Sequence, residues 1–270
     1  MAGLDGRVTV SNMEIVDGAG VVVTGGGGGI GRAIARRLAA EGARVVVNDL
    51  DPAAAEAVAA EIKGFAAPGD AGSADGIAEL IAAARAHLGE IDVYCSNAGT
   101  GGGTSATAPD DDVWQRVWEV NAMAHVRAAR ELLPGWLERG RGTFVITASA
   151  AGLLTMLGAA PYSVTKHAAL SFAEWLGFTY AHRGITVQAI CPLGVRTPML
   201  PAEGEPGFKL LGDAAIEPEA VADAVVAGLA DGRFLILPHP EVAEMYAGRA
   251  AEPDRWRAGM NQLQQFLEAP

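Results

Sequence analysis

A short β-branched run is followed at once by a glycine-rich loop and a helical segment, and this order strongly constrains the fold. Residues 19–24 predict a buried strand, and Thr24-Gly25-Gly26-Gly27-Gly28-Gly29-Ile30-Gly31 comes next. Residues 32–41 have a helical composition and end at Gly42, a typical C-cap. Such a loop lets the backbone approach a pyrophosphate whose charge lies on the helix N-terminus. A flexible turn would have a similar sequence, so the choice between a phosphate-binding loop and a turn depends on the rest of the chain.

Strand-like and helical segments alternate along the remaining chain. Strands are expected at 44–48, 65–68, 92–95, 143–147, 185–191 and 233–237. Helices are expected at 52–63, 73–87, 110–139 (bent at Pro134), 217–230, and around Tyr162 to about residue 182. Alternation of this kind is typical of a parallel sheet covered on both faces. We therefore predict an α/β, Rossmann-type doubly wound fold with a seven-stranded parallel sheet in a single domain.

The ends of the chain have a different character. Residues 1–18 are polar and turn-rich and are interpreted as an N-terminal extension, so the domain covers 19–270. Residues 200–213 hold Pro, Gly and Glu and are interpreted as a substrate loop. Residues 240–268 predict a helical tail that serves packing or a subunit interface.

An acidic residue ends the second predicted strand. Asp49 lies 18 residues after Gly31, near the offset at which an acid accepts hydrogen bonds from an adenosine ribose. A carboxylate there would repel a 2′-phosphate, and positions 48–51 hold no basic residue. The pattern favours NAD over NADP. The alternative is that Asp49 only caps the helix that begins near Pro52.

The third predicted strand also ends in an acid, Asp70, followed by Ala71. We interpret this pair as an adenine contact. Asp in a Gly-Asp-Ala-Gly stretch is equally ordinary turn chemistry, so the alternative stays open.

Tyr162 and Lys166 are four residues apart, and in a helix they share one face. A phenol has an ordinary pKa near ~10, and a cation held nearby lowers it toward the working range of a general acid/base. The alternative is an amphipathic helix with a core Tyr and a surface Lys.

Two further polar residues have suggestive positions. Asn121 lies in mid-helix among apolar neighbours, so its amide must be hydrogen-bonded; an Asn satisfied by neighbouring backbone is the alternative. Ser149 follows the fifth predicted strand, 13 residues before Tyr162.

From about residue 19 to 240 the chain resembles the short-chain dehydrogenase/reductase family in its single-domain form. Thr24-Gly25-x-x-x-Gly29-Ile30-Gly31 matches the cofactor loop of the family, and Asn97-Ala98-Gly99 matches its fourth-strand motif. The four residues Asn121, Ser149, Tyr162 and Lys166 match its catalytic set. Any one motif is common, but the set in this order and spacing is specific.

The resemblance implies a role for each catalytic residue. Tyr162 would exchange a proton with the substrate oxygen while C4 of the nicotinamide exchanges a hydride. Lys166 would hold the nicotinamide ribose and depress the pKa of Tyr162, aided by the positive ring of NAD⁺. Ser149 would hydrogen-bond the substrate oxygen, and Asn121 would hold a water that links Lys166 to solvent.

The resemblance also implies an NAD site. The residues expected to bind it are Gly25, Gly29, Ile30, Gly31, Asp49, Asp70, Ala71, Asn97, Ala98, Gly99, Tyr162, Lys166, Pro192, Val195 and Thr197. Thr197 would contact the nicotinamide carboxamide beside the backbone of Val195.

Two positions depart from the family pattern. The family often has Pro-Gly after the sixth strand, where this chain has Pro192-Leu193, so Leu193 adds bulk beside the nicotinamide face. The usual Asn-Asn-Ala-Gly begins here with Ser96, which can still hydrogen-bond.

Charge and cysteine content exclude several classes of partner. A net charge of −12 argues against nucleic acid and anionic membranes. The sequence shows no secretion signal and no apolar run long enough to span a membrane. Cys95 and Cys191 lie in apolar runs, as expected of buried free thiols rather than a metal site. We expect a cytoplasmic enzyme without a metal.

The expected substrate is a small molecule, uncharged and moderately hydrophobic. Its expected walls are residues 100–104, 150–154 and 200–213 with Leu193 and Met199. The family resemblance also implies a homo-oligomer, a tetramer or a dimer. An NADP-dependent 3-oxoacyl-thioester reductase is the alternative enzyme, whereas a non-catalytic NAD-binding regulator or a methyltransferase would not need both Tyr162 and Lys166.

Overall fold

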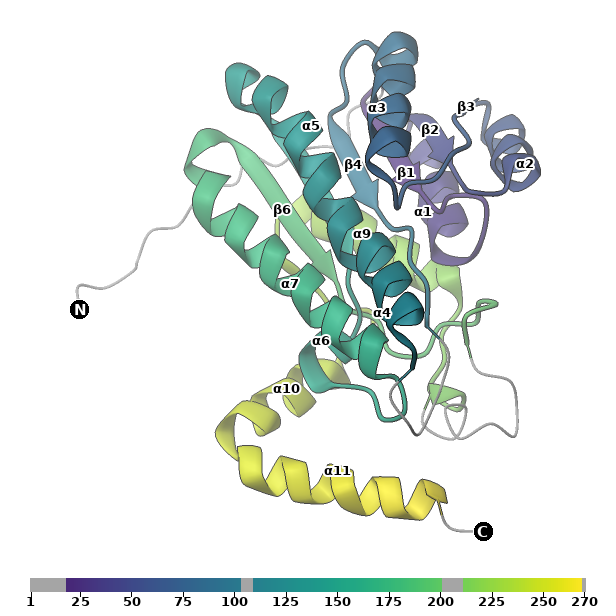
Figure 1. The fold of residues 1–270 in the computed structure, drawn as a ribbon. Helices are drawn as coiled ribbons and strands as arrows, with labels where there is room; N and C mark the ends of the chain where they lie inside the picture. The colour runs from purple at the N-terminus through teal and green to yellow at the C-terminus, as the bar shows by residue number, and fades with distance from the viewer. Residues whose placement is uncertain (1–17, 103–108, 201–210, 269–270) are drawn as a thin grey trace.

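The computed structural model describes residues 18–102, 109–200 and 211–268, and these form a layered α/β fold (Figure 1). Its seven parallel strands have the order β3-β2-β1-β4-β5-β6-β7. They are β1 (Gly20–Thr24), β2 (Arg44–Asn48), β3 (Phe65–Ala66), β4 (Val93–Ser96), β5 (Gly142–Thr147), β6 (Ile185–Ile190) and β7 (Leu235–Ile236). The predicted Rossmann-type doubly wound fold is confirmed.

Helices cover both faces of the sheet, because alternate strand residues point to opposite sides. Val22 and Tyr94 pack with α3 (Ala74–Leu88), α5 (Ala124–Arg139) and α7 (Ala160–Tyr180). Val21, Val23 and Cys95 pack with α1 (Gly29–Ala40), α2 (Pro52–Ile62) and α9 (Pro218–Asp231). The near-continuous Val runs of β1 and β2 are therefore buried on both sides.

The helix expected over 110–139 is interrupted. It begins as α4 (Asp111–Trp118), widens into the π-helical turn η1 (Glu119–Met123) and continues as α5 through Pro134. Single π turns occur mostly at functional positions, and this one contains Asn121. The prediction of one regular helix was wrong here because α-helical periodicity carries no signal for one extra residue.

Several boundaries also differ from the sequence prediction. The first helix begins at Gly29 instead of residue 32, so it includes the last glycines of the loop. Strands β3 and β7 have two residues each. The short helix α6 (Ala151–Leu154) and the 3-10 turn η2 (Ala181–Arg183) were not predicted. Residues 1–17, 103–108 and 201–210, which include most of the N-terminal extension and of the substrate loop, lie outside the described residues.

The helical tail is present as α10 (Glu241–Ala251) and α11 (Pro253–Glu268), which extend below the rest of the fold in Figure 1. None of the described residues of α11 is buried. Among the helices that the structure describes, none is long and apolar enough to cross a membrane.

Candidate active site

The strand ends at the carboxyl edge of the sheet are tied together by Asn97. Its Nδ2 donates to the carbonyl of Thr24 at 3.0 Å, and its Oδ1 accepts from the Thr147 hydroxyl at 3.0 Å. The backbone N–H groups of Asn97 and Ala98 both donate to Thr24 Oγ1. These bonds join β1, β4 and β5, so the predicted dinucleotide and catalytic segments share one edge, which is where parallel α/β folds bind ligands.

The glycine loop is shaped to hold a phosphate group. Helix α1 begins after Gly28 with no side-chain cap and with no acidic residue in its first turn. The N–H groups and the positive dipole end of the helix are therefore available to an anion. A Cβ on Gly31 would lie 2.1 Å from the Gly25 carbonyl oxygen, so only glycine fits there. The residues present fit the pyrophosphate of a dinucleotide.

Asp49 lies at the mouth of this loop and is fixed there. Its Oδ2 accepts from Gly27 N at 2.9 Å and its Oδ1 from Asp51 N at 3.1 Å. The cap of α2 is Asp51, whose carboxylate accepts from Ala53 N at 3.0 Å. The alternative role of Asp49 as a helix cap is therefore not observed. Each carboxylate oxygen retains a lone pair, which fits a ribose hydroxyl.

Asp70 forms a turn of its own. Its Oδ1 accepts from Gly72 N at 2.8 Å, and Ala71 beside it is buried. This is the turn chemistry held open as the alternative. The second carboxylate oxygen of Asp70 remains able to accept from another hydrogen-bond donor.

Ser149, Tyr162 and Lys166 converge below the loop. Lys166 is 3% exposed, and its Nζ lies 5.6 Å from the Tyr162 ring centroid while donating to the Thr147 carbonyl at 2.8 Å. The Ser149 hydroxyl hydrogen-bonds Tyr162. A Cβ on Gly99 would lie 3.3 Å from Asn121 Oδ1 and 3.5 Å from Lys166 Nζ. Tyr162 thus contacts both Ser149 and Lys166, and Asn121 and Lys166 both lie close to Gly99.

Burial dominates the electrostatics of this cluster. It raises the pKa of Tyr162, against the hydrogen bond from Ser149, which lowers it. It lowers the pKa of Lys166 to about 8. The expected lowering of the Tyr162 pKa is therefore not what the protein alone produces, because Lys166 is itself desolvated and directs its ammonium to a main-chain carbonyl.

The amide of Asn121 is already engaged. Its Oδ1 accepts from Thr100 N at 2.8 Å, and its Nδ2 donates to the Thr100 carbonyl at 2.9 Å and to Thr165 Oγ1 at 3.2 Å. This matches the alternative of an Asn satisfied by backbone. Through these bonds the Asn121 amide holds the backbone of Thr100, in the chain after β4, against the π turn.

The remaining predicted cofactor residues lie after β6. Pro192 and Val195 are buried, and the Pro192 carbonyl accepts from Ala150 N at 2.8 Å. A Cβ on Gly29 would lie 3.1 Å from Thr197 Cγ2, so Thr197 packs against the glycine loop. The segment therefore contacts both the chain next to Ser149 and the glycine loop.

Sequence reasoning missed His125, a fully buried imidazole next to this cluster. Its Nδ1 lies 2.7 Å from Ser96 Oγ, and Nε2 has no partner among the described residues. Burial, with the nearby Lys166 charge, lowers the pKa of His125 to about 3. Its position four residues after Asn121 on the same helix was the available signal.

We expect the neutral His125 to make the fold sensitive to acid. The unfolded chain binds this proton near pH ~6.5 and the native state only near pH 3, so stability falls as pH drops through that window. Relative to pH 7, this difference in proton binding lowers the free energy of unfolding at pH 4 by about 3 kcal/mol. Urea unfolding at both pH values should show a smaller acid loss in His125→Asn than in the native chain. His87→Asn, at an exposed His, is the control, and an equal loss in all three proteins would contradict the assignment.

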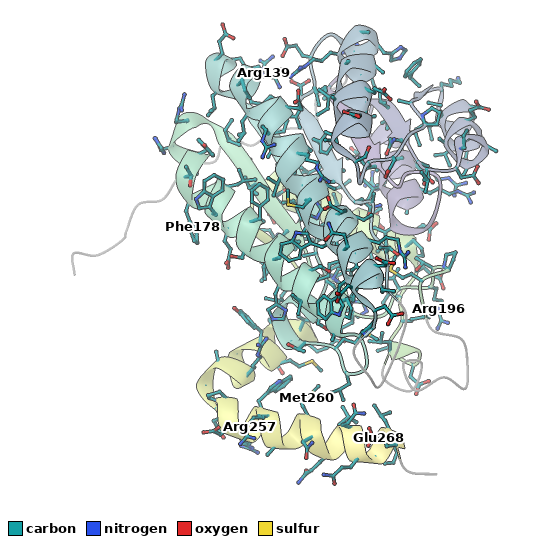
Figure 2. All side chains as sticks on the ribbon, in the orientation of Figure 1. Arg139, Phe178, Arg196, Arg257, Met260 and Glu268 are labelled. Carbon is teal, nitrogen blue, oxygen red and sulfur yellow. The ribbon has the colours of Figure 1, made fainter. Side chains whose placement is uncertain are left out.

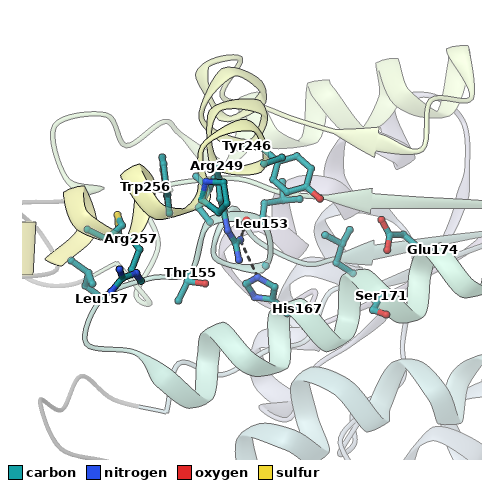
Figure 3. A pocket seen from close by; sticks show the side chains of 16 residues that line it. Leu153, Thr155, Leu157, His167, Ser171, Glu174, Tyr246, Arg249, Trp256 and Arg257 are labelled. Atoms are coloured by element: carbon teal, nitrogen blue, oxygen red, sulfur yellow. Dashed lines mark hydrogen bonds between the residues drawn. The ribbon is translucent and has the colours of Figure 1, made fainter.

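A groove of about 710 Å³ lies beside the predicted site and not within it (Figure 3). Leu153, Leu154 and His167 line one side, and Arg249 and Trp256 of the tail line the other. Arg249 donates to the Leu153 carbonyl and contacts His167 Nε2 at 3.3 Å. None of the four expected catalytic residues lines this groove, so Leu153 and Leu154 face the tail, although they were expected to wall the substrate.

The comparisons with known proteins agree with the fold. A family model described as short chain dehydrogenase matches residues 19–206. A putative ketoacyl reductase of Streptomyces coelicolor is 36% identical over 242 residues, 87% of this chain and 91% of that protein. A solved short chain dehydrogenase/reductase from Burkholderia phymatum in complex with NAD has a TM-score of 0.80 at 25% identity, covering 88% of this chain and 96% of that one. An actinorhodin polyketide ketoreductase variant with NADPH has a TM-score of 0.73 at 31% identity, covering 82% and 95%.

Proposed function

Since the chain belongs to the short-chain dehydrogenase family, we propose that it is an NAD(H)-dependent oxidoreductase that interconverts a secondary alcohol and a ketone. The observation that carries the proposal is the convergence of Ser149, Tyr162 and Lys166 beside the glycine loop. A core tyrosine with a surface lysine would not place a buried ammonium under the phenol ring.

In this proposal each residue has one task. Tyr162 exchanges the proton with the substrate oxygen, and Ser149 hydrogen-bonds that oxygen and fixes its angle. Lys166 holds the nicotinamide ribose hydroxyls. The nicotinamide supplies or accepts the hydride and, when oxidised, adds the positive charge that favours the Tyr162 phenolate. Asn121, whose amide also bonds to Thr100, would hold a water that links Lys166 to solvent as a proton relay.

Asp49 supports NAD as the cofactor. The carboxylate is held at the mouth of the loop, where it suits ribose hydroxyls and opposes a 2′-phosphate. An NADP-dependent 3-oxoacyl-thioester reductase is the second candidate, favoured by the similarity to the ketoreductase that was solved with NADPH.

A panel of secondary alcohols and hydroxysteroids, offered with NAD⁺ or NADP⁺, tests the proposal directly. We expect the absorbance of NADH to rise with an uncharged, moderately hydrophobic alcohol. Turnover of 3-oxoacyl thioesters with NADPH alone would favour the second candidate.

The two cysteines are those expected of a protein in a reducing compartment. Cys95 and Cys191 are free and buried, and burial raises both thiol pKa values to about 12. Protonated thiols of this kind are unreactive, and we place the enzyme in the cytoplasm.

An exposed apolar stripe on α7 supports a homo-oligomer. Val164, Trp175 and Phe178 are 48%, 51% and 83% exposed, and Phe178 points away from the fold (Figure 2). Large exposed aromatics on one helix face mark an interaction surface. We expect Phe178→Asp to lower the molecular mass measured by light scattering from a dimer or tetramer toward a monomer. Leu50→Asp, at an exposed hydrophobic side chain outside α7 and the tail, is the matched control. An unchanged mass for Phe178→Asp would exclude this face.

A further inference from the structure

His239 joins two segments near the proposed nicotinamide site that are distant in sequence. It follows β7 and precedes α10, and it is 3% exposed. Its Nδ1 lies 3.1 Å from Leu193 N, and its Nε2 lies 3.2 Å from the Ala214 carbonyl oxygen. A backbone N–H can only donate, so Nδ1 accepts and Nε2 carries the ring proton and donates. The ring is neutral and both nitrogens are occupied.

The first segment that His239 holds is the chain after β6. Leu193 follows Pro192, whose carbonyl accepts from Ala150 N next to Ser149. Beyond Leu193 the chain reaches Thr197, which packs against Gly29 of the glycine loop. The position of Leu193 therefore affects how this segment meets both the catalytic serine and the dinucleotide loop.

The second segment is residues 211–216, which lead into α9. Ile216 N donates to the Gly194 carbonyl at 3.1 Å, and Arg196 N donates to the Ile216 carbonyl at 2.9 Å. A Cβ on Gly194 would lie 2.3 Å from the Leu211 carbonyl oxygen. The two segments are in direct contact, and His239 bonds to the backbone of both.

We propose that His239 is a positioning residue that fixes residues 192–197 against residues 211–216 and so presets the nicotinamide half of the cofactor site. It acts through the backbone of Leu193 and Ala214 and touches neither substrate nor reacting atoms. The inference rests on the proposed function and on the expectation, from the family resemblance, that Val195 and Thr197 lie beside the nicotinamide.

Three substitutions separate the two hydrogen bonds. His239→Leu removes both. His239→Asn places an amide oxygen near the position of Nδ1 and retains the acceptor for Leu193. His239→Gln places an amide nitrogen near the position of Nε2 and retains the donor to Ala214.

Fluorescence titrations of the full-length protein with NADH and with ADP-ribose, which lacks the nicotinamide, test the role. We expect His239→Leu to weaken NADH binding about tenfold and to leave ADP-ribose binding unchanged. His239→Asn should recover most of the loss and His239→Gln less of it. In steady-state assays KM for NAD⁺ should rise with a smaller change in kcat.

Other results would overturn the role. Equal weakening of both ligands together with a lower Tm would make His239 a general core residue. Unchanged NADH binding in His239→Leu would remove the role altogether. If the native protein binds NADPH in preference to NADH, the proposed cofactor fails, and the ratio of variant to native affinity, measured with NADPH, still decides the inference.

Discussion

Replacing Tyr162 by phenylalanine is expected to lower kcat by about 10²- to 10⁴-fold, the range that general acid/base catalysis contributes. The hydroxyl is the only group lost, and its described partner is Ser149. Since Lys166 retains its bond to the Thr147 carbonyl, the ribose-binding group stays in place. NADH affinity and Tm should therefore stay close to their native values.

The measurement is initial-rate kinetics on whichever alcohol of the panel is oxidised, together with a fluorescence titration of NADH. Tyr180→Phe is the matched control, since it removes a hydroxyl from the far end of the same helix. Turnover of Tyr162→Phe within threefold of native would refute the proposed mechanism.

The arrangement of helices on both faces of a parallel sheet could be predicted, because it depends on local sequence patterns. The Val runs of residues 21–23 and 45–47 are short, β-branched and followed by loops, and a parallel sheet buried on both faces requires such runs. The ends of helices and strands were predicted less accurately where a single tertiary contact determines them. The start of α1 at Gly29 is an example, because glycine has low helix propensity and the end of the loop belongs to the helix only in the folded chain.

The sequence could predict that the candidate site residues lie together, but not their electrostatics. Spacing placed Tyr162 and Lys166 on one face, yet the sequence carries no information on the Thr147 carbonyl that receives the ammonium. Nor does it show that burial outweighs the hydrogen bond with Ser149 and raises the pKa of the Tyr162 phenol. His239 was missed because its partners, Leu193 and Ala214, are far away in sequence, so no local motif identifies it.

Asp49 should decide the choice between the two dinucleotides. Its carboxylate is fixed by Gly27 N and Asp51 N, so it cannot turn away from a 2′-phosphate without losing two hydrogen bonds. A unit charge pair ~4 Å apart near a protein surface costs about 4 kcal/mol before salt screening. We therefore expect kcat/KM with NAD⁺ to exceed that with NADP⁺ by about a hundredfold or more.

Two substitutions separate the charge of Asp49 from its hydrogen bonds. Asp49→Asn retains an acceptor oxygen but no charge, so NADP⁺ should gain while NAD⁺ loses little. Asp49→Ala removes both the charge and the acceptor oxygen. We expect kcat/KM with NAD⁺ to fall about tenfold or more while kcat/KM with NADP⁺ rises, so the preference for NAD⁺ becomes smaller. Asp51→Asn is the matched control: it removes the same charge two residues away, where the carboxylate caps α2, and should lower Tm without changing the preference. A native preference for NADP⁺ would refute the proposed role of Asp49. An equal shift in Asp51→Asn would mean that the general negative field near β2, and not the Asp49 carboxylate, sets cofactor choice.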